Sequence, residues 1–90
     1  MSESYHLFAF DSTHDAIRAQ ALLSGLGAVV MPTLREISAS CGMSLRLTDA
    51  CADEARQTLI GAGLGGWALY RVRQEGKRVF CETVFACRGE

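Results

Sequence analysis

The sequence predicts a single α+β domain in which short strands alternate with two helices. Ninety residues suffice for one domain, and 49% of them are apolar, which argues against an intrinsically disordered chain. Along the chain, the hydrophobic pattern changes between the two-residue period of a strand and the longer period of a helix. We therefore expect one continuous core of sheet and helix, with the modest stability of a short chain.

The N-terminal part of the chain predicts a strand followed by a helix. Residues 5–10, YHLFAF, are aromatic and apolar with partial alternation, as in a strand. Ser12 can cap a helix, and Asp15 stands three residues later, as in a capping box. A glycine at 25 or 27 would end this helix. The apolar residues that recur at helical spacing are Ala16, Ile17, Ala19, Leu22, Leu23 and Leu26.

The middle of the chain predicts two strands separated by a loop. Residues 28–31, AVVM, are short and β-branched, and Pro32 should stop this strand because proline donates no hydrogen bond to a sheet. Residues 33–42 form the expected loop. Residues 43–48, MSLRLT, alternate apolar with polar side chains, which predicts a half-buried strand.

The C-terminal part predicts a second helix and at least one strand. Residues 48–63 are expected to be helical, with Thr48 or Asp49 as the cap. A glycine-rich segment ends that helix, and residues 67–73, WALYRVR, predict a strand. Residues 75–77 look like a turn, and the remaining residues form either an extra strand or a flexible tail.

The resulting order β-α-β-β-α-β predicts a ferredoxin-like fold, with both helices on one face of a four-stranded antiparallel sheet. We assign residues 1–74 to this domain and residues 75–90 to a C-terminal extension. This topology brings three segments to one end of the sheet: residues 12–14, the loop that contains Cys41, and the four glycines Gly61, Gly63, Gly65 and Gly66.

Cys41 is the candidate nucleophile of this end of the sheet. The start of a helix presents backbone N–H groups and partial positive charge, which would stabilise a thiolate. The candidate binding and activating residues are Arg35 as a cation, His14 as a base or ion partner, Ser38 and Ser40 as hydrogen-bond donors, Gly42 as space beside the thiol, and Thr13 at the helix start.

Each of these residues also has a simpler interpretation. Cys41 could be a buried structural thiol, since cysteine is among the most buried residue types. His14 could be an exposed residue of a first helical turn. Arg35 could form a surface ion pair with Glu36 or Asp15, which would add little stability. The glycines most simply break a helix and open a turn.

The segments STHDAIRAQALLSGLG (12–27) and PTLREISASCGMSLRL (32–47) resemble the selenium/sulfur carrier-like family of small bacterial proteins. The loop is the specific part of the resemblance, through Pro32, Arg35, Glu36, Ile37, Ser38, Cys41 and Gly42. Gln20 departs from the glutamate that is usual in the family. The resemblance ends at about Arg73, so Cys81 and Cys87 inherit no role from it.

The resemblance implies a carrier that holds sulfur or selenium on Cys41 as a persulfide-like adduct. Such a protein needs a donor and an acceptor protein but no bound cofactor or metal. One alternative is a small-molecule-sensing or protein-interaction module without covalent chemistry. Another is a redox protein that pairs Cys41 with a second cysteine. The sequence selects neither sulfur nor selenium, assigns no enzymatic activity, and leaves a homodimer open.

Several partner classes are not expected from the composition. The net charge of −1 and the lack of a basic stripe argue against nucleic acid. No apolar run approaches the roughly 20 residues of a membrane span, and the N-terminus lacks signal-peptide features. We therefore expect a cytoplasmic protein with reduced cysteines, whose spacing fits no zinc motif.

Overall fold

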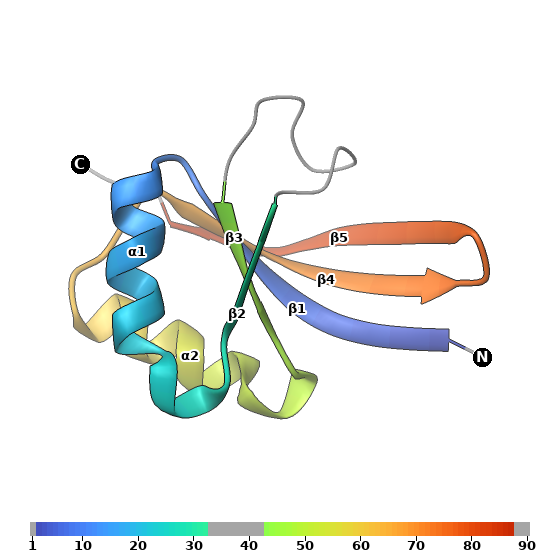
Figure 1. Cartoon of the computed structure of the whole chain (residues 1–90), viewed down its shortest axis with the longest axis horizontal. Helices are drawn as coiled ribbons and strands as arrows, with labels where there is room; N and C mark the ends of the chain where they lie inside the picture. The colour runs from blue at the N-terminus through green and yellow to red at the C-terminus, as the bar shows by residue number, and fades with distance from the viewer. Residues whose placement is uncertain (1, 33–42, 88–90) are drawn as a thin grey trace.

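The computed structural model describes residues 2–32 and 43–87 of the chain (Figure 1). The elements are β1 (Ser2–Phe10), α1 (Thr13–Leu22), a 3-10 helix η1 (Ser24–Leu26), β2 (Val29–Pro32), β3 (Met43–Leu47), α2 (Asp49–Gly61), β4 (Trp67–Glu75) and β5 (Arg78–Cys87). Among the described residues, neither helix has the length and apolar character needed to cross a bilayer.

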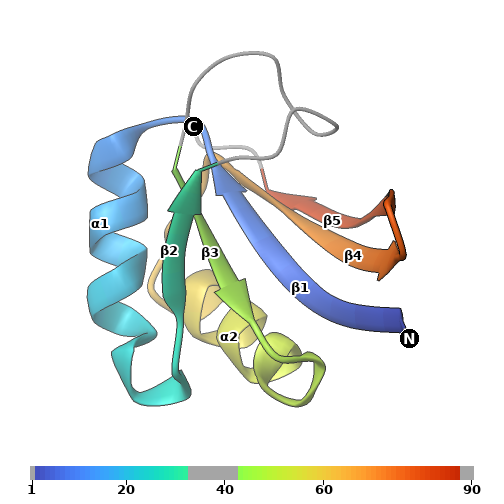
Figure 2. The same cartoon turned by 45° about the vertical axis from the view of Figure 1, so that its right-hand side comes forward.

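The five strands form one antiparallel sheet in the order β2-β3-β1-β4-β5. Helices α1 and α2 lie on one face of this sheet (Figures 1 and 2). The α+β prediction is confirmed. The expectation of four strands is corrected to five, because residues 78–87 form the extra strand rather than a tail and pair with β4 along its length.

A tight turn produces the fifth strand. Glu75 and Arg78 are cross-strand partners, so only Gly76 and Lys77 connect β4 to β5. Gly76 has a φ of 61°, the left-handed conformation that a two-residue hairpin with glycine in its first position uses. The hairpin extends beyond the two helices (Figure 1).

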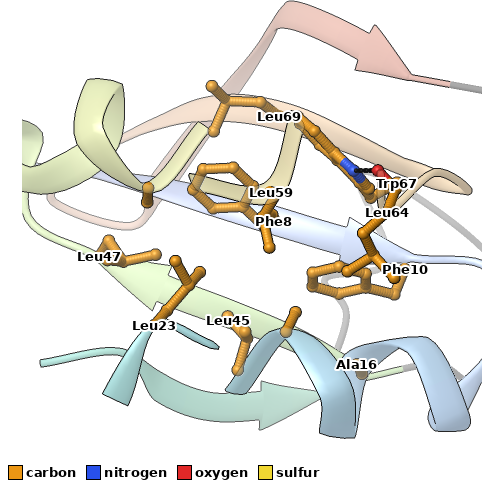
Figure 3. Packing of buried hydrophobic residues seen from close by; sticks show 12 residues of the cluster. Phe8, Phe10, Ala16, Leu23, Leu45, Leu47, Leu59, Leu64, Trp67 and Leu69 are labelled. Atoms are coloured by element: carbon orange, nitrogen blue, oxygen red, sulfur yellow. Dashed lines mark hydrogen bonds between the residues drawn. The ribbon is translucent and has the colours of Figure 1, made fainter. Parts of the chain in front are cut away.

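The main core fills the space between the sheet and the helices. Aromatic rings pack together in it: the ring centroids of the buried Phe8 and Trp67 are 5.4 Å apart, and the half-buried Phe85 packs against this pair with its ring centroid 5.5 Å from that of Trp67. The Trp67 Nε1–H donates to the Leu64 carbonyl at 2.7 Å, which satisfies the polar end of a buried indole (Figure 3). The strands β1, β3 and β4 are thereby joined to α1 and α2 through one apolar cluster.

Helix α1 contacts the sheet through small side chains. Ala16 and Ala19 are buried, as is Leu23 just after the helix. Ile17 and Leu22 also stand at the predicted helical spacing, but both are exposed. Ile17 follows Ala16 by one residue, which rotates it about 100° away from the sheet-facing line. The apolar stripe is therefore narrower than the sequence pattern suggests.

A second, smaller apolar cluster lies on the opposite face of the sheet. Tyr5, Leu7 and Val72 are buried there, and half-buried side chains of β2, β4 and β5 pack against them, including Cys81. The Arg46 guanidinium carbon stands 4.5 Å from the centre of the Tyr5 ring, a cation–π arrangement.

Candidate functional site

Each of the five strands has one of its ends at the same end of the sheet. The cross-strand partners there are Phe10 with Trp67, Ala9 with Ser44, and Pro32 with Met43. Figure 2 shows β1 and β2 ending, and α1 beginning, at this end. The Asp11 N–H donates to the Gly66 carbonyl at 2.9 Å, which joins the start of the first helix to the approach to β4. Two of the three segments predicted to converge, the start of the first helix and the glycines before β4, are therefore adjacent, and the loop that contains Cys41 lies outside the described residues.

Ser12 caps the first turn of α1, as the sequence predicts. Ser12 has an extended backbone, and its Oγ accepts a hydrogen bond from the Asp15 N–H at 3.1 Å. Thr13 is the first helical residue and is exposed. The His14 side chain is 82% exposed, with its Nδ1 4.0 Å from Asp15 Oδ1. Both predicted site residues of this helix thus lie on the surface at the expected end of the sheet.

The other predicted site residues lie outside the described part of the chain. These are Arg35, Ser38, Ser40, Cys41 and Gly42. The structure does describe the two strands that flank this segment: β2 ends at Pro32 and β3 begins at Met43, and these two residues are cross-strand partners. The segment between them therefore leaves from and returns to adjacent strands at this end of the sheet.

Two carboxylates approach the same end of the sheet. Gly66 has a φ of 74°, and a β-carbon built there would stand 3.5 Å from Asp15 Oδ2 and 3.6 Å from Asp11 Oδ2. Both acidic groups lie beside the positive end of α1, where the helix dipole favours them. Asp11 is not among the residues that the sequence pattern indicates. Because these carboxylates repel another anion, stabilising a thiolate nearby would require a positively charged side chain as well as the helix dipole.

The glycines after α2 form a helix-ending turn. The Gly63 N–H donates to the Ile60 carbonyl and the Leu64 N–H donates to the Leu59 carbonyl, with Gly63 at a φ of 75°. This pair of bonds is a Schellman motif, and Leu59 and Leu64 both lie in the main core. The simpler interpretation of this segment, a helix stop followed by a turn, accounts for its geometry.

Ser4, His6 and Asp49 form a polar cluster near the start of β1 that no local sequence pattern indicates. The Ser4 hydroxyl donates to Asp49 Oδ2 and the His6 ring pairs through Nδ1 with Asp49 Oδ1, both at 2.7 Å. These contacts lower the pKa of the Asp49 carboxyl, and the Ser4 hydrogen bond has the largest effect. Partial burial raises this pKa, whereas the hydrogen bond and charge of His6 and the charge of Arg71 lower it further.

The order of contacts in this cluster does not suit nucleophilic catalysis. An activated serine needs the histidine between hydroxyl and carboxylate, so that the ring accepts the hydroxyl proton. Here the carboxylate of Asp49 lies between Ser4 and His6. The cluster instead joins β1 to the first turn of α2. A histidine within an apolar strand was the one local signal, but its partner is 43 residues away.

We expect Asp49→Asn to lower the free energy of unfolding at neutral pH and to have little effect in acid. The folded-state pKa of Asp49 lies below its ordinary value of 3.8, so its ionised form adds stability above that pH and loses it as pH falls through the folded value. Because the side chain is 42% exposed, we expect about 0.5–1 kcal/mol at most. Denaturant unfolding across a pH series measures this.

Asp53→Asn is the matched control, since Asp53 lies in the same helix and pairs at 2.6 Å with Arg56 on the surface. It should leave the pH dependence of unfolding nearly unchanged. An Asp49→Asn effect of the same size in acid and at neutral pH would show that the carboxylate charge is not its origin.

Comparison with known proteins gives one family. The family described as Putative Se/S carrier protein-like matches residues 5–71, which extend from β1 into β4 and include Cys41. No curated protein and no solved structure matches the chain. The resemblance found in the sequence is therefore confirmed, and β5 lies beyond the matched segment. Since the match covers well over half of the 90 residues, the chain belongs to the Putative Se/S carrier protein-like family.

Proposed function

We propose that the protein carries sulfur or selenium on Cys41 and passes it to an acceptor protein. The observation that carries the proposal is the family match over residues 5–71, because the matched segment contains the whole PTLREISASCG loop. The backbone supports it, because Pro32 and Met43, which flank this loop, lie at the end of the sheet where β1 ends and α1 begins (Figure 2).

The proposed transfer needs no oxidant and no bound cofactor. The Cys41 thiolate attacks the outer sulfur or selenium of a persulfide or perselenide on a donor protein. The bond within the donor adduct breaks, the donor leaves as a thiolate, and Cys41 becomes the persulfide or perselenide. The same exchange with an acceptor thiolate returns Cys41 to its starting state. The reducing cytoplasm is the compartment where we place this cycle.

The neighbouring residues are assigned supporting roles in this proposal. Arg35 would offset the negative charge of the thiolate and of Asp11 and Asp15. Ser38 and Ser40 would donate hydrogen bonds to the carried atom, and Gly42 would leave room for the partner's sulfur. Thr13 and His14 would provide the exposed helix start on which the donor or acceptor rests.

Intact-mass measurement of freshly isolated protein tests the proposal. We expect an added mass equal to one sulfur or one selenium atom, which disappears with reductant and maps to the peptide that contains Cys41. Cys41→Ser should abolish the addition, whereas Cys51→Ser, which changes the half-buried thiol of α2, should leave it intact. Loading that persists in Cys41→Ser would reject the proposal and favour a module without chemistry at this residue.

A further inference from the structure

The sheet has two edges of very different character. β5 is ten residues long and, among the described residues, has no strand on its outer side. β2, at the other edge, has four residues and ends at Pro32. Proline and short length protect an edge from pairing with another chain, whereas a long edge strand presents a row of backbone donors and acceptors. β5 is therefore the edge suited to strand addition.

The side chains of β5 leave apolar surface in solvent. Phe80 is 42% exposed and Val84 is 46% exposed. The Arg73 guanidinium carbon stands 5.1 Å from the centre of the Phe80 ring. A hollow of about 80 Å³ lies here, lined by Arg71, Arg73, Phe80 and Glu82. An aromatic side chain added beside Phe80 would cover this hollow and a ring that is now half in water.

The charges on β5 are arranged symmetrically about the same phenylalanine. Arg78 and Glu82 stand two residues before and two residues after Phe80, so all three lie on one face of the strand. Within the described part of the chain, neither Arg78 nor Glu82 forms an ion pair. An antiparallel copy of this strand centred on Phe80 would place Arg78 of each copy opposite Glu82 of the other.

We propose that two copies of this chain associate through β5, antiparallel and with Phe80 on the two-fold axis. Their sheets then form one continuous sheet, with the Phe80 rings opposite each other between two Arg78–Glu82 pairs. On the other face Val79 would meet Cys81 of the second copy. The register shift at Leu69 and Tyr70 places a bulge after this segment, which ends the regular pairing.

The charges select this register over its neighbours. Moving the axis by one residue to Cys81 would set Phe80 opposite Glu82 and Arg78 opposite Val84. Both ion pairs would be lost, and a charged side chain would face each exposed apolar one. These contacts between copies involve β5 alone and are independent of the function proposed for Cys41.

Sedimentation equilibrium tests the proposal through a charge exchange. Arg78→Glu and Glu82→Arg should each weaken dimerisation of the wild-type chain at least about tenfold, because each turns two attractive pairs into repulsive ones. The double variant Arg78→Glu/Glu82→Arg should recover the dimer. Within one chain, Arg78 faces Glu75 and Glu82 faces Arg71, so each substitution also places like charges opposite each other inside the monomer. These effects within the monomer would add in the double variant, and recovery of the dimer can therefore come only from contacts between the two copies. Arg18→Glu on the exposed side of α1 is the matched control and should have no effect.

Disulfide mapping checks the register independently. Phe80→Cys, made together with Cys41→Ser, should form a disulfide between the two Cys residues at position 80 under mild oxidation, because equal residues meet on the axis. A wild-type monomer at all concentrations would overturn the proposal, as would a double variant that fails to recover while its circular dichroism remains native. A disulfide between Cys81 residues instead would overturn the register.

Discussion

Phe8→Ala is expected to lower the free energy of unfolding by about 3–5 kcal/mol. Phe8 is completely buried at the centre of the main core, with its ring 5.4 Å from that of Trp67. Truncation removes the burial of a whole aromatic ring and leaves a cavity that the surrounding strands cannot close. A domain of this size has a total stability of roughly 5–13 kcal/mol, so the melting temperature should fall by more than about 10 °C.

Urea unfolding followed by circular dichroism measures this loss. Phe80→Ala is the matched control, because it removes the same side chain from an exposed position on β5. Measured at a concentration low enough to separate the proposed dimer, the control should cost less than about 1 kcal/mol. Equal losses for the two variants would contradict the assignment of the core to the helix-covered face of the sheet.

Much of the fold follows from hydrophobic period and a few special residues. The apolar pattern around Phe8 located β1, and Ser12 located the start of α1, where its hydroxyl caps the Asp15 N–H. Pro32 marked the end of β2. These features act within a few residues of chain, and local sequence therefore contains the information needed to predict them.

The parts that the sequence left open depend on distant partners. Residues 78–87 read equally as a strand or a tail, because a strand is stable only when another strand accepts its hydrogen bonds. The two-residue turn at Gly76 supplies that partner by folding β5 back on β4 and extending β4 to Glu75. The exposure of Ile17 likewise depends on which side of α1 faces the sheet, and the spacing of apolar residues in the helix does not determine that side.

In the candidate site, too, the features set by local sequence could be predicted, whereas those set by distant partners could not. Local capping signals predict the helix start at Thr13 and His14, and the end of β1, which precedes this helix, lies at the same end of the sheet as the end of β2 and the start of β3. The approach of Asp11 and Asp15 to Gly66 could not be found, since it joins residues about 50 positions apart. That approach brings negative charge to the start of α1, a region that the sequence analysis predicts to favour an anion.

The thiol of Cys41 is expected to react with an alkylating reagent with a pH midpoint below the ordinary thiol value of about 8.5. Arg35→Ala should raise this midpoint by about one unit or more, which lowers the reaction rate at neutral pH roughly tenfold, because each unit changes the thiolate fraction tenfold. The rate is read from the Cys41 peptide by mass spectrometry, so that Cys51, Cys81 and Cys87 do not interfere.

His14→Ala should change the midpoint much less than Arg35→Ala. The His14 ring is mostly in water, with its Nδ1 4.0 Å from Asp15 Oδ1, so solvent screens its electrostatic effect on any thiolate. Asp11→Asn and Asp15→Asn should both lower the midpoint, because each removes a negative charge beside Gly66. Arg18→Ala, on the exposed side of α1, is the matched control for loss of an arginine.

These variants separate a cation-activated thiol from an ordinary one. A wild-type midpoint near 8.5 that none of the substitutions moves would mean that Cys41 is not held as a thiolate, and the proposed transfer would lose its nucleophile. Opposite shifts in Arg35→Ala and Asp11→Asn would instead show that the thiol lies in the combined field of one cation and two carboxylates. In that case the balance of these charges, rather than the start of α1 alone, sets the fraction of Cys41 that can accept a chalcogen at neutral pH.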